Sequence, residues 1–231
     1  MNNKESFLKN RYDPVNNRTI TYDDDSRLNA VLSLIEPRVD KIKVLDIGCY
    51  DGEISKRIKN KLGNCEVYGI DISDNTREEA EKKGIIFKSN DLNEGIDFPD
   101  NMFDLVFAGE IIEHIYDTDF FVDEIKRILK PEGILVITTP NFLSLGRRIS
   151  YLIGRGVYME ASLTYPKNPQ PAGHIRFFTK DLLIGFMGCK GFKIEKYLSD
   201  TINFIGFRSD FLAKVFPPLG RSIICRFRNE K

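Results

Sequence analysis

The sequence lacks the features that mark several common classes of protein. No apolar run approaches the roughly 20 residues of a membrane-spanning helix, and residues 1–18 are too polar for a signal peptide. The four cysteines form no C-x-x-C pair, so neither a zinc ribbon nor a disulfide framework is indicated. Hydrophobic residues make up 42% of the 231 residues, enough to bury a core. We therefore expect a folded, cytoplasmic protein.

The chain also lacks a net charge, because 34 Lys and Arg residues balance 34 Asp and Glu residues. This balance hides an uneven distribution along the sequence. Residues 1–141 carry 19 basic and 28 acidic side chains, whereas residues 142–231 carry 15 basic and 6 acidic ones. The two parts have balances of −9 and +9, and the sign of the second favours an anionic partner.

Short apolar segments alternate with helical patterns along most of the chain. Strands are expected at 44–47, 67–71, 85–87, 103–107, 134–138, 193–198 and 222–227. Helices are expected at 75–83, 117–129 and 144–153 among others, and Ser26 and Thr179 are expected to cap two more. This alternation is typical of βαβ units, in which helices cover both faces of a parallel sheet. The predicted fold class is α/β.

The pattern predicts one domain, residues 1–231, rather than two. Residues 1–40 are expected to form an N-terminal helical cover. The rhythm of strands and helices is interrupted at 142–176 and 201–220, and we interpret both stretches as insertions that cover the side of the fold where an acceptor would bind.

A loop with glycine at both ends follows the first expected strand. Gly48 and Gly52 flank this turn, and Asp71 ends the second expected strand 23 residues after Gly48. Glycine lets a ligand approach the backbone, and the start of a helix supplies free N–H donors. An acid in the position of Asp71 can accept hydrogen bonds from ribose hydroxyls. The loop and Asp71 together indicate a nucleoside ligand.

The loop departs from the G-x-G-x-x-G pattern that binds a pyrophosphate, because Tyr50 stands at the second glycine position. Asp46, Asp51 and Glu53 add negative charge near the ligand. Acidic surroundings are unsuitable for a pyrophosphate and favourable for a cation. S-adenosylmethionine, a sulfonium compound, therefore fits this loop better than NAD.

Five segments resemble, in the right order, the motifs of class I S-adenosylmethionine-dependent methyltransferases, in particular the ubiquinone-biosynthesis O-methyltransferase and methyltransferase type 11 group. They are residues 44–52, 69–73, 90–92, 103–106 and 129–133. The resemblance implies a Rossmann-like, seven-stranded, mostly parallel sheet with a reversed final strand. It assigns Gly48 and its neighbours to the methionine moiety, Asp71 to the ribose, and Asp91 with Leu92 to the adenine. The cofactor-binding candidates are Asp46, Gly48, Cys49, Tyr50, Gly52, Asp71, Ile72, Asp91, Leu92 and Gly109.

Glu110, Glu113 and His114 follow the fourth expected strand at a spacing that would place them on one face of a helix. They resemble the Glu-x-x-Glu-His motif of ubiquinone-biosynthesis O-methyltransferases and small-RNA 2′-O-methyltransferases, which holds a divalent metal. The resemblance implies that these three residues bind Mg²⁺ or a similar ion, with His174 as a further candidate. A metal-free alternative uses His114 or His174 as general base, so the catalytic candidates are Glu113, His114 and His174. A solvent-exposed acidic helix start is the third interpretation.

The basic part mixes arginines with apolar residues, most densely at Arg147, Arg148 and Arg155. One interpretation is an interfacial helix that contacts an anionic membrane and admits a lipid-linked acceptor. A second is a clamp for an acceptor phosphate or carboxylate, with Arg176 as another member. A solvated surface is the third. Nucleic acid is a weaker candidate partner because no module for stacking bases is evident.

These observations predict O-methylation of a small acceptor that is anionic or linked to a lipid or sugar. The alternatives are RNA 2′-O-methylation and a non-catalytic, cofactor-binding regulatory partner. An NAD-dependent oxidoreductase is the least favoured class, because the loop 48–52 lacks the glycines of the pyrophosphate-binding pattern.

Overall fold

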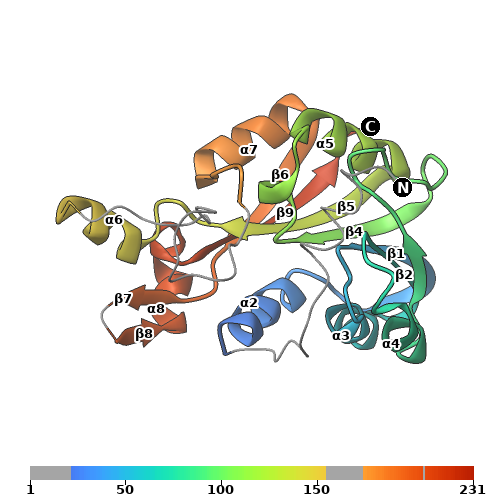
Figure 1. Cartoon of the computed structure of the whole chain (residues 1–231), viewed down its shortest axis with the longest axis horizontal. Helices are drawn as coiled ribbons and strands as arrows, with labels where there is room; N and C mark the ends of the chain where they lie inside the picture. The colour runs from blue at the N-terminus through green and yellow to red at the C-terminus, as the bar shows by residue number, and fades with distance from the viewer. Residues whose placement is uncertain (1–21, 155–173, 205) are drawn as a thin grey trace.

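The computed structural model describes residues 22–154, 174–204 and 206–231 (Figure 1). A seven-stranded sheet crosses the molecule in the order β3-β2-β1-β4-β5-β9-β6. Its strands are β1 (Arg38–Ile47), β2 (Gly63–Asp71), β3 (Ile86–Ser89), β4 (Phe103–Gly109), β5 (Leu129–Pro140), β6 (Phe192–Leu198) and β9 (Ser222–Asn229). The pairs that involve β9 are antiparallel and the other pairs are parallel, which confirms the predicted fold class and the reversed final strand.

Helices cover both faces of the sheet (Figure 1). One face carries α2 (Tyr22–Leu32), α3 (Glu53–Leu62) and α4 (Arg77–Lys82), and the other carries α5 (Thr118–Ile128) and α7 (Lys180–Cys189). Successive residues of a strand point to opposite faces. In β1, Leu45 therefore packs in the core cluster of α5 and α7, whereas Val44 packs in the cluster of α2 and α3. Because the central strands are buried on both faces, they appear in the sequence as continuous apolar runs.

The remaining elements lie mainly in the two predicted insertions. They are η1 (Ile112–His114), α6 (Leu145–Leu152), β7 (Ile202–Phe204), β8 (Phe207–Ser209), α8 (Asp210–Val215) and η2 (Pro217–Leu219). In Figure 1, α6, β7, β8 and α8 gather at one end of the molecule. Residues 1–21 of the predicted cover and 155–173 of the first insertion, including Arg155, lie outside the described residues. Within the described ranges, no helix has the length and apolar character needed to cross a membrane.

The helix caps were predicted correctly at one position and wrongly at another. Thr179 caps α7, since its side chain accepts a hydrogen bond from the Leu182 N–H. The prediction for Ser26 is wrong, because α2 already begins at Tyr22. The buried Ser26 hydroxyl instead donates to Asp210 Oδ2 at 2.9 Å. A serine before an apolar helical pattern does not by itself distinguish a cap from a residue that bonds a distant carboxylate.

Candidate active site

The predicted cofactor residues lie along one edge of the sheet, which we call the cofactor edge. β1, β2, β3 and β4 are parallel, so their carboxyl ends meet at the same edge. The loop 48–52, which we call the cofactor loop, follows β1, while Asp71 ends β2 and Gly109 ends β4. Asp91 and Leu92 come just after β3. The fold therefore brings together residues that are up to 61 positions apart in the sequence.

Backbone hydrogen bonds fix the cofactor loop to the end of β2. The N–H groups of Gly48 and Cys49 both donate to the Ile70 carbonyl, at 2.8 and 3.1 Å. The Tyr50 N–H donates to Asp71 Oδ2 at 3.0 Å, and the Ser73 N–H donates to Asp71 Oδ1 at 3.0 Å. The Asp71 carboxylate is thus held in one orientation at the edge of the sheet.

Gly48 and Tyr50 both have left-handed backbone conformations, with φ of 77° and 49°. Gly48 needs to be glycine for a second reason, since an added Cβ would overlap the Ile111 side chain. Tyr50 occupies the same region of φ without the freedom of glycine, at a cost of about 1–2 kcal/mol. The turn therefore accommodates Tyr50 at the second glycine position of the G-x-G-x-x-G pattern.

Asp46 lies beneath the cofactor loop and is 2% exposed. Its Oδ2 accepts a hydrogen bond from the buried Ser55 hydroxyl of α3. Burial raises the pKa of Asp46 to about 7, against the effect of the Ser55 hydrogen bond, and the charge of Asp71 raises it further. The neighbouring Cys49 is also buried, and burial raises the pKa of its thiol, so it is a packed, protonated side chain.

The prediction that Glu110, Glu113 and His114 share a helix face is wrong. Glu110 has a positive φ of 57° and precedes η1, a single turn of 3-10 helix, so helical spacing does not apply to it. Glu110 Oε1 accepts from the Thr138 hydroxyl at 2.9 Å, and Oε2 lies 3.8 Å from Arg27 Nη1. Burial raises the pKa of Glu110, an effect that the charge of Arg27 opposes. Glu110 is therefore not part of the cluster that the other two residues form.

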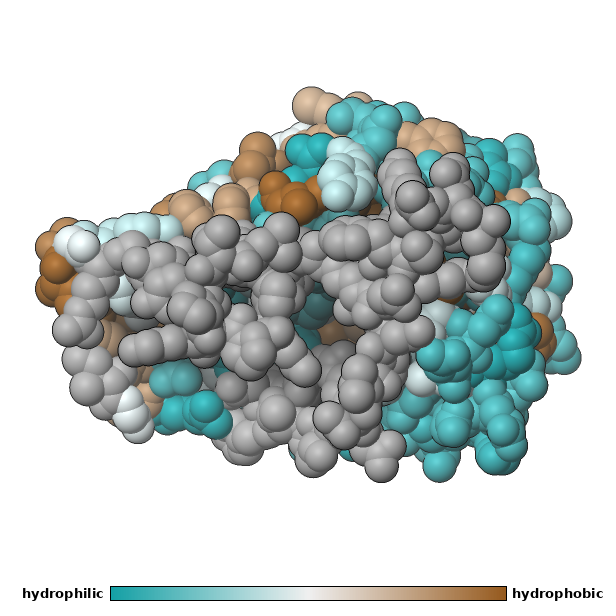
Figure 2. Space-filling model, in the orientation of Figure 1, coloured by the Kyte–Doolittle hydropathy of each residue, from teal (hydrophilic) through white to brown (hydrophobic). Residues whose placement is uncertain are grey.

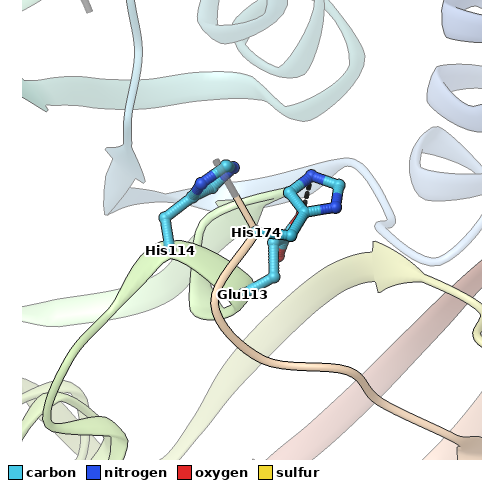
Figure 3. A group of neighbouring side chains, drawn as sticks. All are labelled: Glu113, His114 and His174. Atoms are coloured by element: carbon cyan, nitrogen blue, oxygen red, sulfur yellow. Dashed lines mark ion pairs between the residues drawn. The ribbon is translucent and has the colours of Figure 1, made fainter. Parts of the chain in front are cut away.

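Glu113, His114 and His174 form this cluster, which we call the Glu-His group (Figure 3). Each offers one ligand atom, and these atoms all lie within 4.8 Å of one another. The His114 and His174 rings meet edge to face with centroids 4.9 Å apart. Glu113 Oε1 lies 3.9 Å from His174 Nε2, as the dashed line in Figure 3 shows. Two residues adjacent in sequence are thus joined by a third that lies 60 positions later.

Two buried polar atoms of the Glu-His group lack a hydrogen-bond partner in the part of the chain that the structure describes. Glu113 is 1% exposed, and its Oε2 accepts from the Thr139 hydroxyl at 3.0 Å. The two atoms without such a partner are Glu113 Oε1 and His174 Nδ1. The N–H groups of Ile175 and Arg176 donate to the Glu113 carbonyl at 2.9 and 3.2 Å, which holds His174 in place. Unsatisfied buried donors and acceptors are the atoms expected to meet a ligand.

The pKa values of Glu113 and His174 shift in opposite directions, and both shifts favour the neutral form of the side chain. Burial, reinforced by the charge of Glu110, raises the pKa of Glu113 well above its usual range. Burial also lowers the pKa of His174 to about 4, and the nearby His114 and Arg147 act in the same direction. His174 is therefore a neutral imidazole at pH 7, with a nitrogen lone pair that can bind a metal ion.

A cavity of about 270 Å³ adjoins the Glu-His group, and His174 lies in its wall. The wall also contains three arginines that come from α2, α6 and the turn before β9, and we call this cavity the arginine pocket. Its lining residues are Arg27, Glu110, Pro140, Ser144, Arg147, His174, Arg221 and Ser222. The sequence pointed to Arg147 only. Arg221 could have been suspected because it directly precedes a strand that pairs with the end of β5.

The other arginines proposed as an anion clamp point elsewhere. The Arg176 guanidinium donates to the carbonyls of Ile115 and Tyr116, so it fixes the loop after η1. Arg148 is exposed and donates to the Leu143 carbonyl at 2.6 Å. Both have structural contacts that helical spacing and composition could not reveal.

The middle of the chain matches a family model described as "Methyltransferase domain", over residues 45–137. A ubiquinone biosynthesis O-methyltransferase of Pelagibacter ubique is 38% identical over 109 residues, which are 43% of this chain and 42% of that protein. A ubiquinone/menaquinone biosynthesis C-methyltransferase of Desulfotalea psychrophila is 30% identical over 139 residues, which are 58% of this chain and 56% of that protein. The chain thus spans about half of the length of these curated relatives.

The solved structures agree with the topology of the sheet. A structure described as an S-adenosylmethionine-dependent methyltransferase of Mesorhizobium loti superposes with a TM-score of 0.62 at 17% identity, covering 88% of this chain and 97% of that one. This likeness concerns the fold. The family model and the curated relatives identify residues 45–137 as a methyltransferase domain, and the fold is that of solved S-adenosylmethionine-dependent methyltransferases.

Proposed function

We propose that the protein transfers the methyl group of S-adenosylmethionine to a hydroxyl group of a small acceptor. The observation that carries the proposal is the Glu-His group, which lies beside the cofactor edge of a methyltransferase domain. The segment that leads into the Glu-His group contacts the cofactor loop, since Ile111 packs against Gly48 and lies two residues before Glu113.

The cofactor edge fits S-adenosylmethionine in its chemistry. Asp71 is a fixed carboxylate that can accept hydrogen bonds from the ribose hydroxyls. Asp91 and Leu92 would contact the adenine, as their position after β3 suggests.

The Glu-His group would prepare the acceptor. Methyl transfer is an in-line displacement, so orientation of the acceptor contributes much of the rate. A hydroxyl is a poor nucleophile until it loses its proton, and the imidazole of His114 can accept that proton, whereas the lowered pKa of His174 makes it the weaker base. Glu113 holds the segment of His174 through its backbone carbonyl and presents Oε1 to the same space.

The group also fits a divalent metal, which we propose as part of the site. Its donor set is one carboxylate oxygen and two imidazoles, and Glu113 Oε1, which has no hydrogen-bond partner among the described residues, faces His174 Nε2 at 3.9 Å. A bound cation would lower the pKa of an acceptor hydroxyl. Imidazole donors suit Mn²⁺ or Zn²⁺ better than Mg²⁺.

Calorimetry with Mn²⁺, Zn²⁺ and Mg²⁺ tests the metal directly. We expect one Mn²⁺ or Zn²⁺ per chain, and loss of binding in Glu113→Gln and His174→Ala. Equal binding by these variants, or no binding by the wild type, would reject the metal site while leaving the general-base alternative in place.

The methyltransferase proposal is tested in two steps. Calorimetry should show binding of S-adenosylmethionine and not of NAD; binding of NAD alone would overturn the proposal. Transfer of a labelled methyl group should then be measured to 3,4-dihydroxybenzoate, glycerol 3-phosphate and a short single-stranded RNA. Transfer to a small hydroxyl compound supports the proposal. Transfer to RNA alone would favour 2′-O-methylation, and cofactor binding without any transfer would favour a regulatory partner.

We also propose that α6 and α8 contact an anionic membrane surface. Exposed apolar side chains gather on these helices, among them Leu152 (85% exposed), Phe211 (72%) and Phe216 (54%). Figure 2 shows hydrophobic residues at the end of the molecule where Figure 1 places α6. Arg148 and Lys214 are exposed on the same two helices, a combination that suits anionic lipid.

Co-sedimentation with phosphatidylcholine vesicles, with and without phosphatidylglycerol, tests this contact. We expect binding to the anionic vesicles and its loss in the double variant Leu152→Ser, Phe211→Ser. Val39→Ser is the matched control, because Val39 is 94% exposed and belongs to β1, far from α6 in the fold. No binding, or binding that the double variant retains, would reject the contact.

A further inference from the structure

Two side chains at the ends of α4 reach the cofactor loop. The Thr76 hydroxyl, at the start of this helix, donates to the Tyr50 carbonyl at 2.8 Å. The Lys83 ammonium group, at the end of the helix, donates to the Asp51 carbonyl and to Asp51 Oδ2, both at 2.8 Å. The helix therefore holds two consecutive residues of the loop from both of its ends.

These two side chains serve the loop rather than their own helix. Thr76 occupies the N-cap position of α4, where a threonine side chain usually accepts a hydrogen bond from the first turn. Among the described residues it accepts no such bond, and it is 7% exposed. The side chain of Lys83 is 21% exposed, although lysine side chains generally extend into solvent. Both side chains are thus directed to the loop.

The backbone of the loop also packs against α4, which is itself fixed to the sheet. An added Cβ at Gly52 would lie 3.0 Å from the Cα of the fully buried Ala80. The Arg77 guanidinium lies over the Phe87 ring of β3 at 4.8 Å and donates to the Phe87 carbonyl at 3.3 Å. The helix therefore connects the cofactor loop to the edge strand of the sheet.

The contacts with α4 extend through Tyr50 to Asp71, the carboxylate proposed to bind the ribose. Tyr50 has a φ of 49°, a left-handed conformation that a residue other than glycine keeps only where its surroundings determine it. Its carbonyl accepts from Thr76, and its N–H donates to Asp71 Oδ2. A rearrangement of this turn would therefore also displace the N–H group that orients Asp71.

Most of the acidic side chains of the loop have cationic partners. Lys83 Nζ lies 2.8 Å from Asp51 Oδ2 and 3.9 Å from Glu53 Oε2. Arg57 Nε lies 3.3 Å from Glu53 Oε1. Two of the three acidic residues that the sequence places near the ligand are therefore paired. The pair of Lys83 and Asp51 fixes the shape of the loop and adds little net charge to it.

We propose that Thr76 and Lys83 are positioning residues for S-adenosylmethionine. They hold Tyr50 and Asp51 so that the loop and Asp71 have their binding geometry before the cofactor arrives. Such preorganisation strengthens binding, because the loop need not be ordered when the ligand binds. The inference rests on the proposed cofactor and adds two residues that act on it through the loop.

The sign of the effect separates positioning from a simple effect of charge. The ammonium group of Lys83 repels a sulfonium cation, so loss of this charge alone would strengthen binding of S-adenosylmethionine. Loss of positioning weakens it. S-adenosylhomocysteine has a neutral sulfur, so positioning affects both compounds equally, whereas the charge affects the two compounds differently.

Calorimetry on the full chain measures the dissociation constants of S-adenosylmethionine and S-adenosylhomocysteine. Lys83→Met and Thr76→Val should each raise both constants about tenfold. Thr76→Ser keeps the hydroxyl and should bind both compounds like the wild type. Unchanged or tighter binding in Lys83→Met and Thr76→Val would overturn the inference. Thr76→Val alone decides it if Lys83→Met fails to fold, and binding by Thr76→Ser as weak as that by Thr76→Val would overturn it as well.

Lys190→Met is the matched control. Lys190 is the C-cap residue of α7, as Lys83 is of α4, and its side chain is 17% exposed. It pairs with Asp119 and Asp123, both at 2.9 Å, on the opposite face of the sheet. Urea unfolding should show similar losses of stability in Lys190→Met and Lys83→Met, while Lys190→Met keeps wild-type dissociation constants. Equal weakening of cofactor binding in the two variants would reveal a general effect of stability and overturn the inference.

Failure of the inference and failure of the proposed function give different results. A wild-type chain that binds neither compound would reject the proposed cofactor. Wild-type binding that Lys83→Met and Thr76→Val both retain would reject the positioning role alone.

Discussion

The cofactor edge and the arginine pocket are neighbours in the fold, but they are built in different ways. The cofactor edge consists of short segments directly after parallel strands, held by backbone hydrogen bonds such as those of Gly48 and Cys49 to Ile70. The pocket consists of side chains from α2, α6 and the turn before β9, brought together by tertiary packing. The first region depends on local turns and strand order, and the second on the whole fold.

The two regions also differ in charge, although not along the boundary that the sequence suggests. Acidic residues cluster at the cofactor edge and arginines in the pocket. Arg27, however, belongs to the acidic part of the sequence, residues 1–141, and so does Glu110 beside it. The division between the two regions is therefore spatial, and the −9 and +9 balances only approximate it.

Removing the Glu113 carboxylate should have the largest effect and tests the acceptor side. Glu113→Gln should lower methyl transfer to the small acceptor about 10²–10⁴-fold, because the side chain contacts the proposed reaction space. Binding of S-adenosylmethionine should change little, since Glu113 is not on the cofactor edge. Labelled methyl transfer and calorimetry measure the two quantities.

The control for this prediction is Glu78→Gln, an exposed glutamate on α4, whose side chain is 77% exposed. It should keep wild-type turnover. Wild-type turnover in Glu113→Gln would show that the Glu-His group does not act on the acceptor.

The buried Asp46 makes the stability of the cofactor side depend on pH. Its folded pKa of about 7 lies above its unfolded value of 3.8, so the folded state holds the proton more tightly. The resulting stabilisation is fully present below pH 4 and is lost as the pH rises to 7, a difference of about 4 kcal/mol. Asp46→Asn should remove this slope from the free energy of unfolding measured in urea between pH 4 and pH 8.

Parallel curves for Asp46→Asn and the wild type would contradict this prediction. Asp46→Asn should also be more stable than the wild type at pH 8, where the buried carboxylate is charged and the amide is not.

Gly48 belongs to the cofactor loop and packs against Ile111, which precedes the Glu-His group in sequence. Gly48→Ala should lower the free energy of unfolding by about 2–4 kcal/mol, because the Cβ would occupy a left-handed conformation and overlap Ile111. Denaturant unfolding measures the loss, and calorimetry should show weaker binding of S-adenosylmethionine.

Gly63 supplies the matched control, with φ of 81° and no atom within 4 Å of an added Cβ. Gly63→Ala should cost only about 1–2 kcal/mol for the backbone conformation. Equal losses in the two variants would mean that the contact with Ile111 contributes nothing.

The smallest expected effect concerns the link between α2 and the second insertion. Ser26→Ala should lower the free energy of unfolding by about 1 kcal/mol, since it removes the hydrogen bond to Asp210. Ser33→Ala should change it by less than about 0.5 kcal/mol, because the exposed Ser33 hydroxyl donates only to the Ala30 carbonyl of its own turn. A loss in Ser33→Ala as large as in Ser26→Ala would remove the evidence for this link.

Much of the fold was predictable because its signals are local. The apolar run at β1, the glycine after it and the cap at Thr179 each depend on a few neighbouring residues. The order of the motifs then predicted the family, and with it the position of Asp71 at the end of β2. The geometry of Glu110 was not predictable, since helical spacing assumes a helix and the chain instead turns through a positive φ.

The sequence by itself determined the class of the fold, and it named the residues of the cofactor edge and Glu113, His114 and His174 as candidates. Strand and turn signals depend on a few neighbouring residues, so they can be recognised in the sequence alone. Only the tertiary structure decided which residues share the acceptor side: it removed Glu110 from the metal candidates, joined His174 to His114 and added Arg27 and Arg221 to Arg147. Those contacts span 60 to almost 200 residues, and no local pattern encodes a distance of that kind.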